Sequence, residues 1–478
     1  MRVLKILVCA TLALLCAGSC KKDDITPSLV LSRTSLYFDD WGAGPQSLTY
    51  VPTDAVQVAV SSVTTGWSAS VNQATCTLTV APPASADLEY ASSGVVLLTA
   101  LSKDSVSRSY AVYVYICDVV ELDSNGLANC YVVTERGKNY LFAPKMPDGT
   151  PLDVASAKLL WQSYYGLVES VALDNDGRIS LFVEGDEPGN ALVAACDAKG
   201  DVLWSWHIWI SSENPLTDVA TYSPGGKVFM TRNLGAYTNS NGDADEQKIH
   251  DSYGLYYQWG RKDPFLRPAD HKCSGGSGET VYTSLGGYVE MPVVQSSATE
   301  GTVEYATAHP TTFIANAAAL AEGESRKADW LAVPNDALWG DGSTKSLYDP
   351  CPAGWRVPTA AELAVLSLSE QEDATDLNVA RRQFGWHLTD GVNSHFYLGG
   401  GYYRYADGAL ENMNYKEGDL HAHPEPWQGH YWSSTATADG RSRSLFFELV
   451  TTRLQNKFDN NRAAYRANAM QVRCVKID

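Results

Sequence analysis

The sequence has little positive charge for its length. Across 478 residues, 36 lysines and arginines stand against 55 aspartates and glutamates, so the formal net charge is -19 at pH 7. Nucleic-acid binding depends on lysine and arginine side chains that neutralise phosphates. No basic stripe interrupts the acidic composition. We therefore exclude nucleic acid as a partner.

The signatures of common catalytic sites are also missing. The chain has no G-x-S-x-G elbow, no H-E-x-x-H zinc motif, no P-loop and no dinucleotide-binding fingerprint. His421, His423 and His430 could together hold Zn²⁺ or Cu²⁺, but their Pro-rich surroundings indicate an exposed loop without rigid ligand geometry. We expect no enzyme activity, no catalytic residues, no metal site and no cofactor.

Cysteines at metal-binding spacing are absent as well. None of the ten cysteines forms a C-x-x-C pair, which argues against a zinc ribbon. Seven lie beyond the first twenty residues, namely Cys76, Cys117, Cys130, Cys196, Cys273, Cys351 and Cys474. An odd number leaves at least one free thiol, and single cysteines in large β domains are often small buried hydrophobes.

The apolar run near the N-terminus is too short to cross a membrane. It covers residues 6–15, whereas a spanning helix needs roughly 20 apolar residues. Arg2 and Lys5 precede the run, and small residues follow it, a pattern typical of a signal peptide. The sequence Ala17-Gly18-Ser19-Cys20 resembles a bacterial lipobox, which implies that Cys20 is lipidated. A plain signal peptide with an incidental cysteine is the alternative.

The residues after Cys20 bear on where such a lipoprotein resides. The charged cluster at residues 21–24, Lys-Lys-Asp-Asp, resembles the surface-export signal of lipoproteins in the Bacteroides group. We predict a signal peptide over residues 1–19 and a lipidated tether over residues 20–28. The N-terminal lipid would make the membrane a partner and hold the protein, surface-exposed, at the cell outer membrane.

Short alternating apolar stretches separated by polar turns fill residues 29–117. Val56-Gln57-Val58-Ala59-Val60 and Tyr110-Ala111-Val112-Tyr113-Val114 are examples. Strands at this spacing predict a β-sandwich. With Gly66-Trp67-Ser68-Ala69 followed by a Leu-Thr-Val strand, the segment resembles a BACON-type immunoglobulin-like domain.

Residues 118–213 predict a second β domain that ends in a tryptophan-rich strand. Trp204, Trp206 and Trp209 lie within six residues, and the first two share a strand face. An aromatic platform for sugar rings is one interpretation. We favour a core strand, because large aromatic side chains stabilise most when they are buried.

Five motifs mark residues 214–478. They are Lys227-Val228-Phe229-Met230-Thr231-Arg232-Asn233-Leu234-Gly235, Tyr253-Gly254-Leu255-Tyr256-Tyr257-Gln258-Trp259-Gly260-Arg261-Lys262-Asp263, Asp349-Pro350-Cys351-Pro352-Ala353-Gly354-Trp355-Arg356-Val357-Pro358, Tyr431-Trp432-Ser433-Ser434-Thr435 and Val472-Arg473-Cys474-Val475-Lys476. In this order they resemble the Fibrobacter succinogenes major paralogous (FISUMP) domain. The resemblance implies a C-type-lectin-like α+β fold in surface-displayed lipoproteins and, in some relatives, at the tips of bacterial pili.

A helix is expected directly after the third motif. Thr359 and Glu362 form a capping-box pair three residues apart, which predicts the helix start. Leu363, Leu366 and Leu368 would then form its buried stripe.

The FISUMP resemblance also implies a disulfide. A lectin-like fold would place this helix beside the terminal strand, so Cys351 and Cys474 are a candidate disulfide; two reduced buried thiols are the alternative. Candidate ligand-binding residues are Trp427, Trp432, Tyr402 and Tyr403. For the two tyrosines, which follow a Gly-rich run, we favour packing in a sheet core over lining a groove.

These patterns predict a multidomain, mainly β protein. N-terminal immunoglobulin-like β-sandwich domains would precede a C-terminal α+β C-type-lectin-like domain. The arrangement suits an adhesin or pilus-tip-type protein that recognises glycan or protein ligands. One alternative is a structural fimbrial subunit that joins pilus subunits by strand exchange. Another is a polysaccharide-binding accessory of an outer-membrane uptake system.

Overall fold

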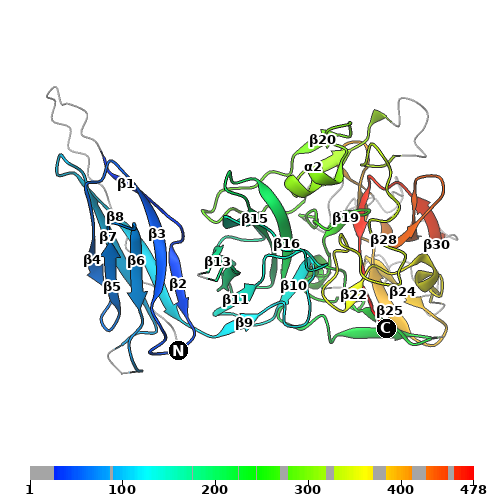
Figure 1. Cartoon of the computed structure of the whole chain (residues 1–478). Coiled ribbons are helices and arrows are strands. Elements are labelled where there is room, and N and C mark those ends of the chain that lie inside the picture. The colour runs from blue at the N-terminus through cyan, green and yellow to red at the C-terminus, as the bar shows by residue number, and fades with distance from the viewer. Residues whose placement is uncertain are drawn as a thin grey trace. The chain divides into compact units, whose positions relative to one another are not determined.

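The protein is mainly β and folds into two compact units. The computed structural model describes residues 26–86, 90–174, 176–223, 225–243, 245–269, 278–318, 328–369, 384–411, 427–449 and 457–478. Residue contacts divide the chain into Met1–Ile116, the first unit, and Cys117–Asp478, the second unit (Figure 1). Among the described helices, none has the length and apolar character needed to cross a membrane. The predicted signal peptide and Cys20 lie outside the described residues.

The first unit is a β-sandwich of two four-stranded sheets. One sheet has the order β1 (Ser28–Leu31), β3 (Gln46–Thr53), β6 (Thr77–Ala81) and β5 (Ser68–Asn72). The other has the order β2 (Ser35–Phe38), β8 (Ser107–Ile116), β7 (Ser93–Leu101) and β4 (Gln57–Val63). Strand β2 runs parallel to β8, and the remaining pairs are antiparallel.

The core of the first unit follows from the period-two pattern of its strands. In β6, Leu78 and Val80 are fully buried while their neighbours are half-buried. Trp67 packs edge-on against Phe38 at 5.4 Å between ring centroids, and its indole N–H donates to the Ala91 carbonyl at 3.2 Å. The sheets therefore share one apolar interior, as the alternating sequence predicts.

The second unit opens with two further four-stranded sheets. One has the order β10 (Cys130–Val133), β16 (Val202–Ile210), β15 (Gly189–Cys196) and β12 (Ser156–Gln162). The other has the order β13 (Val168–Leu173), β14 (Ile179–Val183), β11 (Lys138–Phe142) and β9 (Val119–Glu121). Side chains from both sheets, among them Tyr131, Phe142 and Leu181, form one buried cluster.

The tryptophan-rich strand β16 separates two cores. Trp204 and Trp206 lie in the cluster between these two sheets, whereas Trp209 lies in a second cluster built mainly from residues after position 229. All three are almost fully buried. The prediction of a core strand rather than a sugar platform is confirmed.

The C-terminal part of the second unit consists of several small sheets. The largest has the order β27 (Leu410–Glu411), β26 (Tyr402–Tyr403), β31 (Ala469–Gln471), β28 (Trp427–Ala436), β29 (Ser442–Leu449) and β30 (Lys457–Ala464), with β19 (Tyr256–Gln258) also paired to β31. A second has the order β17 (Val219–Tyr222), β18 (Lys227–Met230), β32 (Val475–Lys476) and β22 (Trp355–Arg356). Smaller sheets join β20 (Val293–Gln295) to β21 (Phe313–Ala315), and β23 (Ser367–Leu368) to β24 (Gly385–Thr389) and β25 (Ser394–Leu398).

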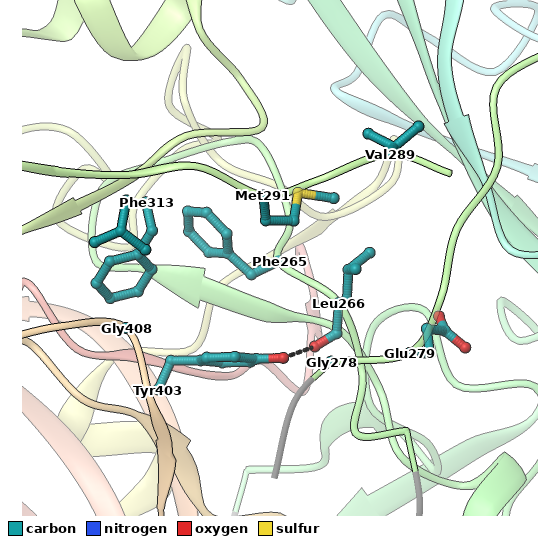
Figure 2. Close-up of a pocket in the computed structure, with 10 residues that line it drawn as sticks. Phe265, Leu266, Gly278, Glu279, Val289, Met291, Phe313, Tyr403 and Gly408 are labelled. Atoms are coloured by element: carbon teal, nitrogen blue, oxygen red, sulfur yellow. Dashed lines mark hydrogen bonds between the residues drawn. The ribbon is translucent and has the colours of Figure 1, made fainter. Parts of the chain in front are cut away.

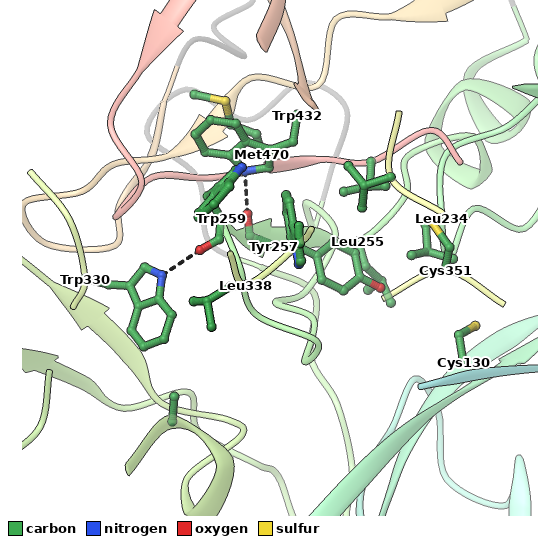
Figure 3. Close-up of a cluster of buried hydrophobic side chains, with 14 of the residues drawn as sticks. Cys130, Leu234, Leu255, Tyr257, Trp259, Trp330, Leu338, Cys351, Trp432 and Met470 are labelled. Carbon is green, nitrogen blue, oxygen red and sulfur yellow. Dashed lines mark hydrogen bonds between the residues drawn. The ribbon is translucent and has the colours of Figure 1, made fainter. Parts of the chain in front are cut away.

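One apolar cluster joins the early and late strands of the second unit. It joins Cys130 and Trp209 of the early strands to Trp259, Trp330 and other aromatic side chains of the C-terminal part (Figure 3). Several indole N–H groups buried here donate to backbone carbonyls, as Trp330 does to the Trp259 carbonyl at 2.7 Å, whereas the Trp161 indole N–H has no partner among the described residues. Segments 118–213 and 214–478, expected as separate domains, therefore share a core within one compact unit.

The described helices are short: α1 (Glu246–Asp251), α2 (Val303–Ala308) and α4 (Ala360–Leu363). Helix α4 begins with the predicted capping box of Thr359 and Glu362. It ends sooner than the leucine pattern predicts, and Leu368 instead lies in β23. The Asn460 side-chain amide donates to the carbonyls of Ala364 and Leu366 at 3.0 and 2.8 Å, so β30 supplies the partners that a longer helix would have provided.

A buried histidine on β16 should make the second unit sensitive to acid. His207 Nε2 lies 2.8 Å from Asn190 Oδ1, Nδ1 has no partner, and burial lowers the pKa of the ring to about 3. Between pH 6.5 and 3 the unfolded chain binds a proton that the folded protein does not, so stability falls as pH drops. Because each unit of pKa difference corresponds to about 1.4 kcal/mol, His207→Gln should remove roughly 2–3 kcal/mol of the stability difference between pH 7.5 and 4.5.

Urea unfolding at the two pH values measures this difference directly. The exposed His309, changed to glutamine, is the matched control. An identical pH dependence in His207→Gln and the unaltered protein would show that His207 takes up its proton without unfolding.

Candidate functional site

A hairpin over residues 279–291 extends the edge of an early sheet. The Gln162 and Tyr282 backbones exchange two hydrogen bonds of 2.9 and 2.8 Å, so the hairpin adds to β12. The Gln162 side chain is fully buried and donates to the Thr283 carbonyl at 3.3 Å. These bonds tie the hairpin to the core of the second unit.

The hairpin tip is a tight turn that requires glycine. The Thr283 N–H donates to the Gly287 carbonyl at 2.7 Å, and the Gly286 N–H donates back to the Thr283 carbonyl at 3.1 Å. Gly286 adopts a φ of 80°, in the left-handed region that L side chains rarely occupy. The tip conformation is thus fixed by sequence.

Exposed apolar side chains gather at this tip. Tyr165 is 63% exposed, Leu285 91% and Tyr288 76%, and the half-buried Tyr282 ring lies 5.5 Å from that of Tyr288. A β-carbon at Gly286 would come within 3.2 Å of the Tyr165 ring, so this ring rests against the hairpin backbone. We call Tyr165, Tyr282, Leu285 and Tyr288 the tyrosine cluster.

The loop after β14, which contacts the residue next to Tyr165, is acidic. It contains Glu184, Asp186 and Glu187, and the Tyr164 hydroxyl donates to the Glu187 carbonyl at 2.5 Å. Arg136 is a cation at this loop and donates to the Gly185 carbonyl at 2.8 Å. The net charge of -19 disfavours anionic ligands in general. A neutral or cationic ligand suits this surface.

A pocket of about 290 Å³ lies on the other side of the hairpin. Its walls are mostly apolar and come from four separate parts of the chain: Phe265, Leu266, Val289, Met291, Val293, Phe313 and Tyr403, with Gly278, Glu279 and Gly408. In Figure 2, Phe313 and Gly408 lie at one end, and Val289 and Glu279 lie at the other. The Tyr403 hydroxyl donates to the Leu266 carbonyl at 2.8 Å, which closes one wall.

Glu279 belongs to a buried ion pair at its end of the pocket. Arg267 Nε lies 2.6 Å from Glu279 Oε2, and both side chains are at most 10% exposed. Burial raises the pKa of the Glu279 carboxyl, and the adjacent Arg267 guanidinium opposes that rise. Glu279 Oε1 is buried without a hydrogen-bond partner.

The four predicted ligand-binding residues lie in different surroundings in the structure. Trp432 is fully buried and donates its indole N–H to the Tyr257 carbonyl at 2.7 Å, so it offers no ring face to a ligand and that prediction is wrong. Tyr403 lines the pocket. Tyr402 is half-buried and donates to Glu411 Oε2 at 3.2 Å. Trp427 begins β28, and its side chain lies outside the described residues.

Cys351 and Cys474 are joined by a disulfide in the structure, with their Cα atoms 6.1 Å apart. It lies in the large apolar cluster, one residue before the paired strand β32 and close to β22. Four other cysteines are free thiols: Cys76, Cys117, Cys130 and Cys196. The pairing implied by the FISUMP resemblance is therefore the one that the fold makes.

The histidine-rich stretch does not assemble a metal site in the part of the chain that is described. His430 is buried in β28 with its Nε2 2.8 Å from Gln428 Oε1, and burial lowers its pKa to about 3. His421 and His423 lie outside the described residues. No group of three histidine, cysteine, aspartate or glutamate side chains suited to a metal ion occurs among the residues with described positions.

The sequence interpretation missed the tyrosine cluster. A local signal was present, since Tyr282 and Tyr288 flank Leu285-Gly286-Gly287, a pattern that favours a hairpin with an exposed tip. Tyr165 could not be joined to it from sequence, because more than a hundred residues separate the two segments. The backbone pairing of Gln162 with Tyr282 brings them together.

Comparisons with known proteins give no family. No family model and no curated protein matches the sequence. Solved structures that resemble it include the D00-D0 domain of intimin, at 11% identity, covering 38% of this chain and 96% of that one, with a TM-score of 0.16. Protocadherin gamma B2 extracellular cadherin domains 1–5 match at 11% identity, with coverage of 40% and 41% and a TM-score of 0.16.

A third match is the Bacteroides ovatus mixed-linkage glucan utilization locus protein SGBP-B, solved in complex with a mixed-linkage heptasaccharide. It is 11% identical, covers 43% of this chain and 49% of its own, and has a TM-score of 0.14. At such TM-scores these likenesses carry no argument about the function of this chain.

Proposed function

We propose that this protein is a surface lipoprotein of the adhesin or pilus-tip type, and that its tyrosine cluster binds a neutral glycan. The observation that carries the proposal is the exposure of Leu285 and Tyr288 on an anchored hairpin and of Tyr165, whose ring lies against Gly286 at the hairpin tip. Contiguous exposed apolar side chains of this kind mark interaction sites. Anchorage through Cys20 to the outer membrane would place that site outside the cell.

The chemistry of the cluster favours sugar over other ligands. A tyrosine ring offers an apolar face for the C–H groups of a pyranose and a hydroxyl for its polar edge, and ordering it costs little conformational entropy. The backbone contact of Tyr165 with Gly286 holds one ring in place before binding. The net charge of -19 disfavours anionic polysaccharide, so a neutral glycan is the ligand that the surface suits best.

Glycan and protein arrays probed with soluble residues 21–478 test the proposal, followed by titration of each hit. Tyr165→Ala and Tyr288→Ala should each weaken glycan binding roughly 5–30-fold, because removing one stacked ring costs about 1–2 kcal/mol. Tyr113→Ala, at a tyrosine that is 43% exposed in the first unit, is the matched control and should leave the dissociation constant unchanged.

Two outcomes would contradict this function. A glycan that binds Tyr165→Ala and Tyr288→Ala as tightly as the unaltered protein would place the site elsewhere. Protein hits without any glycan hit would replace the sugar by a protein ligand.

A further inference from the structure

The pocket behind the hairpin has the features of a second, independent binding site. Its volume of about 290 Å³ is roughly twice the ~150 Å³ of an apolar cavity that holds benzene. It is therefore large enough for on the order of ten non-hydrogen atoms. The three aromatic rings of Phe265, Phe313 and Tyr403 form its walls at one end.

The opposite end carries the only acidic side chain among the lining residues. Glu279 lies there with Val289, and its Oε1 is a buried hydrogen-bond acceptor with no partner among the described residues (Figure 2). Its side chain is 10% exposed. A buried acceptor without a donor is costly, and a ligand that supplies the donor removes that cost.

We propose that this pocket binds a small, elongated apolar alcohol, with its apolar body between Phe265, Phe313 and Met291 and its hydroxyl donating to Glu279. The mostly apolar walls of the pocket favour a ligand with an apolar body. The unpaired Oε1 of Glu279 favours a ligand that also carries a hydrogen-bond donor.

The ion pair of Glu279 with Arg267 bears on whether the hydrogen-bond donor of the ligand is neutral or charged. This guanidinium already lies 2.6 Å from Glu279 Oε2 and supplies the compensating positive charge. Arg267 Nη1 also lies 3.5 Å from Asp251 Oδ1, so its charge is shared between two carboxylates. A ligand cation would lose its hydration in the mostly apolar pocket. A neutral hydroxyl meets the acceptor without that cost.

This site does not depend on the proposed glycan site. Successive side chains of a strand point to opposite faces, so Val289 lines the pocket while Tyr288 joins the tyrosine cluster on the other face. Substitutions in one site should leave binding at the other unchanged. The glycan titrations and the pocket titrations can therefore fail independently of each other.

Calorimetric titration of the soluble protein with three matched compounds tests the proposal. The probes are 2-phenylethanol, its methyl ether, which lacks the donor, and 2-phenylethylamine, which carries an ammonium. We expect saturable binding of the alcohol, with an affinity roughly tenfold above that of the ether because a hydrogen bond to a charged group is lost. The amine should bind more weakly than the alcohol.

Two substitutions separate the site from general hydrophobic binding. Val293→Trp places a ring across the pocket and should abolish binding of all three probes; Val293 is 47% exposed, so the fold tolerates the change. The same substitution at the 77% exposed Val392, which does not line the pocket, is the control. Glu279→Gln should reduce the preference for alcohol over ether several-fold and leave the affinity for the ether unchanged.

Equal binding of the alcohol and the ether would overturn the proposal, as would tighter binding of the amine. Unchanged binding in Val293→Trp would place the probes outside the pocket and would overturn it equally.

Discussion

Replacing both Cys351 and Cys474 with alanine should lower the free energy of unfolding of the second unit by about 4–5 kcal/mol, beyond the cost of two small core truncations. The two residues are separated by 123 positions in the chain. A cross-link across so long a loop removes much of the conformational freedom of the unfolded chain, and the stabilisation grows with loop length in the chain-entropy model. Urea unfolding followed by tryptophan fluorescence measures the loss.

Because of the position of the disulfide, its removal should destabilise both the early and the late strands of the second unit. Cys474 precedes β32, which pairs with both β18 and β22, so the bond fastens the end of the chain to a central sheet. Both sulfurs lie in the apolar cluster shared by the early and late strands. Without the cross-link, unfolding of the last strand would expose that cluster.

Cys130→Ala is the matched control, because Cys130 is a free, fully buried thiol in the same cluster. It removes one sulfur without opening a cross-link. Reduction of the unaltered protein should reproduce most of the loss caused by the double substitution. A double variant no less stable than two such single truncations would contradict a stabilising role of the bond.

The sequence predicted local features better than their assembly. The capping box of Thr359 and Glu362 was readable because its partners lie three residues apart. The burial of Trp204 and Trp206 was predicted from residue size, because large aromatic side chains stabilise most when they are buried. The early end of α4 was not readable, because Asn460, which caps it, is almost a hundred residues away.

The candidate sites were even harder to predict from the sequence, because they depend on contacts between distant segments. Tyr403 was named from its aromatic character, yet its place in a pocket depends on Phe265, Met291 and Phe313, which come from other segments. Trp432 has the same character and is core. Residue type alone does not distinguish an exposed ring from a buried one when the strand lies inside a unit covered on both faces.

Buried ion pairs were beyond prediction for the same reason, and Arg466 is the clearest case. Its side chain is fully buried, with Nη1 3.4 Å from Asp329 Oδ2 and Nη2 2.5 Å from Asp336 Oδ1. The guanidinium lies over the Trp259 ring at 4.4 Å and donates to the Arg441 carbonyl. It thus connects the segment after residue 328 to the C-terminal strands through charge, stacking and hydrogen bonds.

Arg466→Met should lower the free energy of unfolding by about 3–5 kcal/mol at pH 7.5, because it leaves the buried Asp329 carboxylate without a cation. Burial raises the pKa of Asp329 to about 6 even with Arg466 in place. A carboxyl with a raised pKa favours the folded state at low pH and loses that contribution as pH rises through about 6. The cost of Arg466→Met should therefore be smaller at pH 5, where Asp329 is largely protonated, than at pH 7.5.

Two further variants separate the lost charge from the lost packing. Asp329→Asn combined with Arg466→Met removes both charges and should recover part of the stability, since replacing a buried pair costs less than breaking it. Arg466→Lys keeps the charge but cannot reach Asp329 and Asp336 together. Its free energy of unfolding should therefore lie between that of the unaltered protein and that of Arg466→Met. If Arg466→Met costs the same at pH 5 and pH 7.5, the guanidinium stabilises the unit through its contacts with Trp259 and the backbone instead of through Asp329.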